Sequence, residues 1–530
     1  MRKVHLILLF FTLLCTTSCT ARMDAMTDTV PLADTLVIDS VVVPEALLPF
    51  ADTLFPSAEK ILFVIDTFEK EIPGELLYLE DDYPELPGVF TFRGSPSRNP
   101  NFRGMLHGDS IDIHTEWVFV TEYDRTETSH GTWGGGTGWT GQPLFIHWPD
   151  SLMAKFSDPD SLEWTPPAKE VIVASLCGKV YFIDFETGEP TRKAFDTKNV
   201  LKGTPALNPY LNGDLYIGHG VQKQTPFGHH VYNLFTNEVV QAIGKDTKAW
   251  RGWGAFDASP VEVGGFLFRS GENGTLYKYY IADGDFRLHS TLRYSLTKYR
   301  STPGMESSMA VCRNYGYLTD NAGNVLCVNL NTLQPVWHYK NLDDTDASPL
   351  VDVEDDIPYV YTGCEVDRQG IAGSSRFVKL HGLTGERLWE DTIRCRRIQI
   401  GEKTLDGGMF GSPLLGAGDC EGMIFANFCI NKTSAKGQLI AFDKSDGTIL
   451  YRTKTKQYCW SSPVPFFNAD NEMFVFTADC AGNVYLIQGK TGEIVATKRV
   501  GGNFESSPII VEDKIILGSR GNKIYKISLE

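Results

Sequence analysis

The sequence predicts an all-β protein, an eight-bladed β-propeller made of four-stranded antiparallel blades. Three observations support this fold class. The chain contains 50 Gly, 27 Pro and 12% aromatic residues, which favours short strands and turns over helices. A step of Ser or Thr followed by Pro recurs about every 52 residues, a spacing in the range of propeller blades. The stretches between these steps alternate apolar and polar residues and contain Gly-bearing turns, as strands joined by hairpins do.

Length and charge exclude several classes of protein. A chain of 530 residues is too long for one ordinary core, so it forms several domains or one large repeat fold. The net charge of −17 argues against a nucleic-acid-binding protein, which would present a basic face. No internal apolar run reaches the roughly 18–20 residues that a membrane-spanning helix needs.

The first 18 residues have the features of a bacterial lipoprotein signal peptide. Arg2 and Lys3 precede an apolar stretch, Val4–Leu14, that is too short to span a bilayer, and small residues then precede Cys19. An ordinary secretory signal, in which this cysteine has no role, is the alternative. We predict cleavage before Cys19 and lipidation of Cys19. Two or more acyl chains on that residue would give a stable anchor.

Residues 19–89 are interpreted as a tether between the anchor and the propeller. An Asp followed by Thr or Ser and then an aliphatic residue recurs four times in it. This pattern resembles the O-glycosylation acceptor motif of one phylum of Gram-negative bacteria, although an acidic, Thr-rich linker would also contain it by composition alone. The candidate acceptors are Thr29, Thr35, Ser40 and Thr53. One amphipathic helix is expected over residues 57–71.

The Pro steps define eight repeat units within residues 90–530. Two of them, Gly141-Gln142-Pro143 and Ser307-Ser308-Met309, are degenerate members that fit the spacing. The last unit supplies only three strands before the chain stops at Glu530. We therefore expect residues 113–123 to provide the missing outer strand and to close the ring, which removes a free sheet edge. The six regular steps end at Pro205, Pro260, Pro349, Pro413, Pro463 and Pro508.

These units resemble the repeats of pyrroloquinoline-quinone (PQQ)-type β-propellers. The resemblance rests on the strand–turn–strand sequences of residues 329–337 and 378–389. Phe92-Arg93-Gly94 and Ser97-Arg98-Asn99 are similar to the segment that leads into such propellers. In that family a Thr-Gly turn is followed by a Trp that docks one blade against the next. Here the docking position holds Trp337, Trp389 and Tyr451, whereas Arg192, Gln241 and Ala496 replace it elsewhere.

The resemblance implies one of two functions. Some members are quinone dehydrogenases that hold PQQ and Ca²⁺ above the channel and often carry a pair of adjacent cysteines, which this chain lacks. Others are non-catalytic lipoproteins, including the propeller subunit of the outer-membrane β-barrel assembly machinery. The signal, the anchor and the degenerate repeats are more similar to this second branch.

One repeat position is acidic on several blades. The residue three places before each Pro step begins the innermost strand, so these eight residues are expected to surround one mouth of the channel. Neighbouring carboxylates repel each other unless water, a cation or Lys202 offsets their charge. A solvated acidic funnel is one interpretation, and a site for a cation, a quinone or a cationic peptide is the other. The ring is Thr140, Lys202, Asp257, Glu306, Asp346, Phe410, Trp460 and Glu505, of which Lys202, Asp257, Glu306, Asp346 and Glu505 are the candidate ligand-binding residues.

The cysteines and histidines form no recognised metal-binding or redox motif. The nine cysteines after Cys19 include no CxxC pair, so we expect small buried side chains rather than a metal or redox site. His219, His229 and His230 cluster without zinc-site spacing and indicate a polar hairpin. Four aromatic residues near the ring are expected to form a rim: Trp133, Trp250, Trp253 and Tyr458.

The sequence therefore predicts a lipid-anchored envelope β-propeller that acts as a binding or scaffold module for other envelope proteins. Candidate partners include the outer-membrane assembly machinery, and no enzyme activity, cofactor or metal is expected. No acidic cluster follows Cys19, which favours the periplasmic face of the outer membrane. The alternative is a periplasmic alcohol dehydrogenase-like oxidoreductase that depends on PQQ and Ca²⁺.

Overall fold

A computed structural model describes residues 61–72, 83, 86–108, 111–156, 167–296, 302–400, 403–431 and 435–530. The predicted signal peptide, Cys19 and the glycosylation candidates Thr29, Thr35, Ser40 and Thr53 lie outside these residues. The propeller belongs to one compact unit, residues 41–530.

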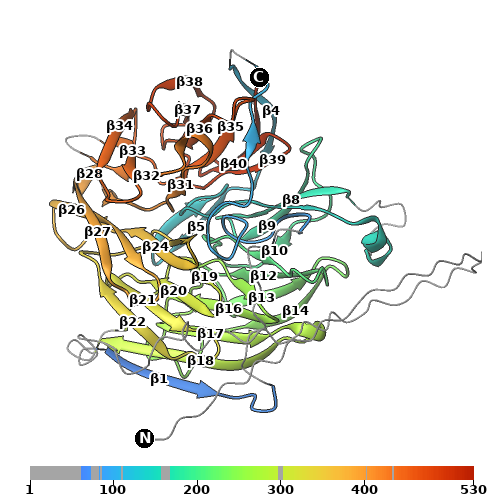
Figure 1. Ribbon diagram of the computed structural model, residues 1–530. Coiled ribbons are helices and arrows are strands. Elements are labelled where there is room, and N and C mark those ends of the chain that lie inside the picture. Colours follow the sequence, from blue (N-terminus) through green and yellow to red (C-terminus); the bar gives the residue numbers. More distant parts are fainter. Residues whose placement is uncertain are drawn as a thin grey trace, which may run out of the picture. The chain divides into compact units, whose positions relative to one another are not determined.

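Eight antiparallel sheets form the blades, and they follow one another in chain order around a common centre (Figure 1). Each inner strand starts directly after one of the eight Pro steps, as predicted. The blades are: blade 1, β7 (Leu144–His147), β8 (Lys169–Ala174), β9 (Lys179–Asp184) and β10 (Phe195–Asp196); blade 2, β11 (Ala206–Leu207), β12 (Asp214–Gly218), β13 (His229–Asn233) and β14 (Glu238–Ile243); blade 3, β15 (Val261–Val263), β16 (Phe266–Gly271), β17 (Thr275–Tyr280) and β18 (Arg287–Leu296); blade 4, β19 (Ala310–Cys312), β20 (Tyr315–Thr319), β21 (Asn324–Asn329) and β22 (Pro335–Lys340).

The second half repeats this pattern. Its blades are: blade 5, β23 (Leu350–Glu354), β24 (Ile357–Gly363), β26 (Ala372–His381) and β27 (Arg387–Arg396); blade 6, β31 (Leu414–Leu415), β32 (Met423–Cys429), β33 (Gly437–Asp443) and β34 (Ile449–Thr455); blade 7, β35 (Val464–Phe467), β36 (Met473–Ala478), β37 (Asn483–Gln488) and β38 (Ile494–Arg499); blade 8, β39 (Ile509–Val511), β40 (Lys514–Ser519), β41 (Lys523–Leu529) and β4 (Ile113–Val120).

Several short elements lie between the blades. Two of them, β25 (Glu365–Val366) and β30 (Gly407–Gly408), extend the sheet of blade 6. Two hairpins project from the ring, β5 (Asp124–Thr128) with β6 (Gly131–Gly134) and β28 (Ile398–Ile400) with β29 (Lys403–Leu405). The helices among the described residues are three short 3₁₀ segments, and none is long and apolar enough to cross a membrane: η4 (Asp150–Lys155), η5 (Ala282–Gly284) and η6 (Gly418–Cys420).

Burial along each blade explains why these sequences form strands. The middle strands are buried on both faces because each sheet packs between two neighbours; all six residues of β36 are buried, for example. Their sequences are accordingly almost continuously apolar. The outer strands are largely exposed, as in β38. The core is therefore divided into clusters between blades, such as the one that joins Phe182 of blade 1 to Leu215 of blade 2. Seven of the nine cysteines among the described residues are buried.

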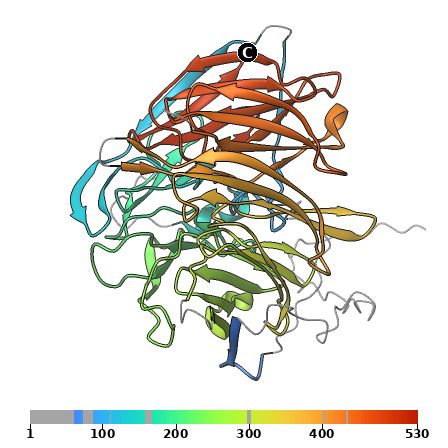
Figure 2. The same cartoon turned by 90° about the vertical axis from the view of Figure 1, so that its left-hand side faces the viewer.

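The N-terminal strand closes the ring as predicted. β4 pairs antiparallel with β41, from Ile113 opposite Leu529 to Val120 opposite Lys523. Figure 2 shows the blue β4 beside the red C-terminal strands. The last blade thus has four strands and no open outer edge on β41.

The predicted helix over residues 57–71 is wrong in its described part. Residues 61–67 form a strand, β1 (Ile61–Thr67), which pairs along its whole length with β18. Phe63 and Ile65 pack against the core of blade 3, whereas Leu62 is 51% exposed. This alternation has the period of a strand, and the open edge of β18 satisfies its backbone groups. Part of the predicted tether is therefore a fifth strand of blade 3.

Several residue types at the docking position donate the same hydrogen bond to the next blade. Trp337 and Trp389 donate their indole N–H to Gly382 O (2.7 Å) and Lys444 O (3.0 Å) of the next blade. The turn glycine lies beneath the ring, and a Cβ on Gly385 would come within 2.7 Å of Trp337. Tyr451, Arg192 and Gln241 donate to carbonyls of the following blade in the same way, to Gly489 O, Leu234 O and Phe286 O. Three of the four departures from Trp therefore keep the hydrogen bond, and Ala496, which has no side-chain donor, is the exception.

A plug closes one end of the central channel. It is the segment between β2 (Gly88–Val89), which pairs with β7, and β3 (Gly104–Met105), which runs parallel to β35. Arg93 donates to Pro463 O (2.8 Å) and Pro413 O (3.2 Å). Arg98 donates to four oxygens, among them Met309 O (2.8 Å) and Ser259 O (3.1 Å). The two arginines of the Phe-Arg-Gly and Ser-Arg-Asn motifs thus fasten the plug to blades 3, 4, 6 and 7.

Candidate functional site at the channel mouth

The end of the channel opposite the plug brings the ring residues together. Seven of the eight surround the axis: six line one small cavity, and Lys202 contacts carboxylates that line it. Phe92 of the plug forms part of its wall. The cavity has a volume of about 20 Å³, which is room for about one water molecule. The residues lining it from the ring are Thr140, Asp257, Glu306, Asp346, Phe410 and Trp460.

Lys202 neutralises one side of the ring. Its ammonium group contacts Asp257 directly and lies 3.6 Å from Glu306 Oε2 and 3.9 Å from Glu272 Oε1. Burial by itself lowers the pKa of Lys202, but the three carboxylates outweigh burial and raise it. Lys202 also lies 4.4 Å from the centre of the Trp139 ring, a cation–π contact. This lysine is the counter-ion that the sequence suggested for Asp257.

The other side of the ring has no such counter-ion among the described residues. Asp344, Asp346 and Glu365 each keep one buried carboxylate oxygen without a hydrogen-bond partner. Burial, followed by the charges of the neighbouring carboxylates, raises the pKa of all three well above the usual value. These groups therefore retain protons at pH values where exposed carboxyls have lost them.

Both carboxylate trios have the spacing of metal ligands. One oxygen from each of Asp257, Glu272 and Glu306 lies within 4.8 Å of the others, and the same holds for Asp344, Asp346 and Glu365. Ca²⁺ binds oxygens at about 2.3–2.6 Å, so this spacing suits oxygens around one ion. Lys202 already supplies the positive charge of the first trio, so the second trio is the one whose donor set fits a hard cation.

Glu505 occupies a different place from the other acidic ring residues. It accepts from Asn503 (2.7 Å) and pairs with Arg520 (3.2 Å). It lines an open groove of about 500 Å³ beside the axis, together with Trp133, Tyr458 and Trp460. The indole N–H groups of Trp133 and Trp460 have no hydrogen-bond acceptor among the described residues.

The aromatic rim forms only in part. Trp133 and Tyr458 line the groove, and Trp253 donates to Glu272 Oε2 (2.9 Å) at the ring. Trp250 does not join them, since it is 40% exposed and lies over Arg293 on β18, the fourth strand of blade 3. Sequence proximity to Trp253 was a poor guide because the chain leaves the mouth between the two residues.

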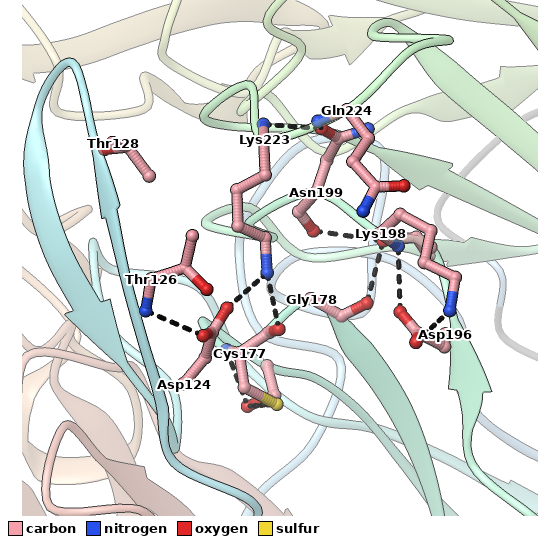
Figure 3. A network of polar contacts seen from close by, with 12 residues as sticks. Asp124, Thr126, Thr128, Cys177, Gly178, Asp196, Lys198, Asn199, Lys223 and Gln224 are labelled. Carbon is pink, nitrogen blue, oxygen red and sulfur yellow. Dashed lines mark hydrogen bonds and ion pairs between the residues drawn. The ribbon is translucent and has the colours of Figure 1, made fainter.

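A salt bridge fixes the hairpin that carries Trp133. Lys223 of blade 2 reaches across to Asp124 at the start of β5 (2.6 Å) and also donates to Cys177 O (3.0 Å), as Figure 3 shows. Partial burial acts to raise the pKa of Asp124, but the hydrogen bonds from Lys223 and Thr126 outweigh it and lower the pKa to about 2. The hairpin is thereby held over blades 1 and 2.

The alignment of Pro steps missed three acidic residues of the mouth: Glu272, Asp344 and Glu365. Glu272 lies in the turn between β16 and β17, and Glu365 follows β24. In antiparallel blades the end of the second strand lies beside the start of the first strand, so these residues reach the same mouth. The Gly-containing turn after each second strand was the signal that could have found Glu272.

The axis of the mouth has no space for a bound quinone. On the axis, Trp460 stacks on Phe410 at 4.6 Å and meets Trp139 edge-on at 5.7 Å, which leaves only the 20 Å³ cavity. A planar multi-ring cofactor has no space there. The second carboxylate trio fits a cation, but the quinone that would share it does not fit beside it.

A family model and several solved structures are similar to this chain. A PQQ-type family model described as "Outer membrane protein assembly factor BamB" matches residues 435–530. Quinohemoprotein alcohol dehydrogenase from Comamonas testosteroni is similar in structure, with a TM-score of 0.56, 12% identity, and coverage of 83% of this chain and 80% of that one. BamB from Moraxella catarrhalis gives a TM-score of 0.47 at 14% identity, covering 68% and 95% of the two chains. The chain therefore has a β-propeller fold, and its last 96 residues match the PQQ-type family model.

Curated proteins match only locally. Beta-alanine-activating enzyme from Homo sapiens is 28% identical over 108 residues, which is 18% of this chain and 10% of that protein. The Danio rerio protein of the same name is 28% identical over 105 residues, 19% of this chain and 9% of that protein. The chain thus spans about a tenth of the length of the curated relatives that it matches.

Proposed function

We propose that this protein is a non-enzymatic binding module of the bacterial cell envelope, anchored by lipid on Cys19 at the periplasmic face of the outer membrane. The observation that supports it most is the asymmetry of the channel. One end is sealed by Arg93 and Arg98, and the other presents buried carboxyls beside an aromatic groove. An acidic, aromatic mouth is complementary to cationic segments of a partner protein.

The partner class follows from this chemistry. The groove beside Glu505 offers aromatic faces, on Trp133, Tyr458 and Trp460, for a Lys or Arg side chain. Its volume of about 500 Å³ accommodates a few residues of an extended chain. The family model is described as an outer-membrane assembly factor, so proteins of that machinery are the partners to test first.

Site-specific crosslinking tests the binding face. A photo-crosslinking residue at Tyr123, a 56% exposed residue that lines the groove, should yield a salt-sensitive adduct in intact cells. The matched control is Val495, which is 42% exposed on the outer strand of blade 7. Equal adducts at both positions, or none at Tyr123, would contradict the proposed face.

The competing function is a PQQ- and Ca²⁺-dependent oxidoreductase. Purified protein mixed with PQQ and Ca²⁺ should show no bound quinone absorbance and no dye-linked alcohol oxidation. Either signal would overturn the non-enzymatic assignment.

The anchor is tested separately: Cys19→Ala should move the protein from the membrane fraction to the soluble periplasm, and a variant that still sediments in high salt would refute lipidation.

A further inference from the structure

One buried arginine differs from the others in having no partner. Arg269 on β16 is 1% exposed, and none of its three guanidinium nitrogens has a hydrogen-bond acceptor among the described residues. Arg93 and Arg98 bind backbone carbonyls, and Arg192 forms a buried ion pair with Glu170 (2.8 Å). A buried guanidinium without an acceptor is costly, because it has lost its hydration and gained nothing comparable.

Aromatic side chains, not carboxylates, surround this guanidinium. It lies 5.4 Å from the centre of the Phe256 ring, and its cross-strand neighbour is Tyr277. Burial lowers the pKa of Arg269 to about 10, with Tyr279 and Tyr216 as the groups that act to raise it. No carboxylate of the described residues forms an ion pair with it.

The three neighbouring histidines cannot supply the missing negative charge and do not add positive charge. Burial, His230 and then Arg269 lower the pKa of His219 to about 3, and burial and Arg269 also lower the pKa values of His229 and His230. All three are therefore neutral at physiological pH. His229 donates or accepts at Nε2 with Tyr279 Oη (3.1 Å), while its buried Nδ1 has no partner among the described residues.

An open groove of about 600 Å³ lies against this cluster, between blades 2 and 3. Its inner wall includes His229, Phe256, Tyr277 and Tyr279, which are the side chains around Arg269. Its rim carries four cationic side chains, which outnumber the three carboxylates that also line it. The cations are Lys245, Lys248, Arg287 and Arg293, and the carboxylates are Asp66, Glu69 and Asp246.

These carboxylates are already engaged. Asp66 pairs with Arg293, Glu69 lies 3.9 Å from Arg287, and Tyr277 donates its hydroxyl to Asp246 (2.9 Å). Lys245 and Lys248 lie over aromatic rings, at 5.7 Å from Phe227 and 4.9 Å from Phe68. Arg287 also pairs with Asp285 (2.7 Å), so Lys245 and Lys248 are the rim cations without an ion pair among the described residues, and Arg269 lies behind the aromatic inner wall.

We propose that this groove binds a small molecule bearing an oxyanion, a carboxylate or a phosphate, which pairs with Arg269. The anion enters between the two lysines and meets the guanidinium once one of the intervening aromatic rings turns aside. A bidentate pair between the guanidinium and the oxyanion then satisfies Arg269, and His229 Nδ1 gains a partner. The groove volume is that of a small-molecule site rather than of a single ion.

Calorimetric titration with inorganic phosphate at constant ionic strength tests the site. The protein is the full chain with Cys19→Ala, which avoids the membrane anchor. Phosphate should bind to it and to the matched surface control Arg499→Gln with the same affinity. Arg269→Gln should bind at least tenfold more weakly. Absence of binding to the parent protein, or equal affinity in all three proteins, would overturn the proposal.

A second variant covers the case in which Arg269→Gln fails to fold. The double change Lys245→Gln and Lys248→Gln alters only the rim and should weaken phosphate binding severalfold. Unchanged affinity in that variant would count against the groove as the route of entry and overturn the proposal.

Vesicles identify the source of the oxyanion. If the parent protein sediments with phosphatidylglycerol vesicles but not with phosphatidylcholine vesicles, and phosphate competes, the ligand is a lipid headgroup. Phosphate binding without sedimentation identifies a soluble ligand. Both results retain the site. Sedimentation that is identical for Arg269→Gln and insensitive to phosphate would refute it.

Discussion

The two ends of the central channel differ in whether buried charged groups have hydrogen-bond partners. At the plugged end, Arg98 donates four hydrogen bonds, two of them to oxygens of its own plug and two to carbonyls of blades 3 and 4. At the mouth, Asp344, Asp346 and Glu365 share a small space and leave carboxylate oxygens unpaired. A fully satisfied charge stabilises one structure, whereas an unsatisfied one lowers stability unless something binds it. The plugged end is therefore structural, and the mouth is the end at which we propose that a partner binds.

The largest effect is expected at the plug. Arg98→Met removes every one of those bonds and leaves buried carbonyls without donors, so it should lower the free energy of unfolding by about 3–5 kcal/mol. Urea denaturation followed by fluorescence measures this loss. The matched control is Arg499→Gln on the exposed outer strand of blade 7, which should change stability by less than about 0.5 kcal/mol. An Arg98→Met protein as stable as the parent would show that the plug does not hold the blades together.

Removal of Lys202, the counter-ion of the first carboxylate trio, should have the next largest effect. Lys202→Met leaves Asp257, Glu272 and Glu306 without their counter-ion, and we expect a loss of about 3 kcal/mol at pH 8. The loss should shrink as pH falls, because burial raises the pKa values of Asp257 and Glu272 and these two carboxyls take up protons first. Thermal unfolding at pH 8 and at lower pH values measures it. A loss that does not depend on pH would indicate that Lys202 acts by packing alone.

Neutralising the second trio should stabilise the protein. The pKa values of Asp344, Asp346 and Glu365 are raised in the folded state, so the folded protein holds protons that the unfolded chain releases above about pH 4. The free energy of unfolding therefore falls as pH rises from about 4 through the raised pKa values of these three groups. The variant Asp344→Asn, Asp346→Asn, Glu365→Gln should lose this dependence and gain about 1–3 kcal/mol at pH 8.

Thermal unfolding with and without Ca²⁺ distinguishes a mouth that binds a partner protein from one that holds a metal ion. The non-enzymatic proposal expects the same Tm for the parent protein with and without Ca²⁺. A stabilisation of about 2.7 kcal/mol at a hundredfold excess over Kd, absent from the triple variant, would instead establish a cation site at Asp344, Asp346 and Glu365.

The smallest effect concerns the hairpin over the mouth. Asp124 has a lowered pKa of about 2, so its contribution is present above about pH 4 and is lost as pH falls toward 2. Asp124→Asn should cost about 1 kcal/mol at neutral pH and nothing near pH 2. Hydrogen exchange of residues 124–134 should rise in the variant at neutral pH, while exchange in blade 5 stays constant. Unchanged exchange in the hairpin would mean that Lys223 does not anchor it.

Comparison of prediction and structure shows which signals are local. The Pro steps, the turn glycines and the three-strand last unit are set by backbone geometry within one blade, and the blade number and the closing strand followed from them. The ring position also followed, because each blade repeats the same path. The strand at residues 61–67 was missed because its partner, β18, lies more than 200 residues away in the chain. Glu272 and Glu365 were missed because they reach the mouth from other turns.

The sequence by itself therefore determined the repeat, the closure of the ring and the acidic character of one channel mouth, since all three depend on residue type at a regular spacing. Only the tertiary structure decided which hydrogen-bond partners each buried charged group has. Arg98 and Arg269 are both buried arginines, and residue type alone does not say which of them has hydrogen-bond partners. Arg98 faces the carbonyls of two blades, whereas Arg269 lies against aromatic rings, and the physical cause of this difference is which distant blade packs against each side chain.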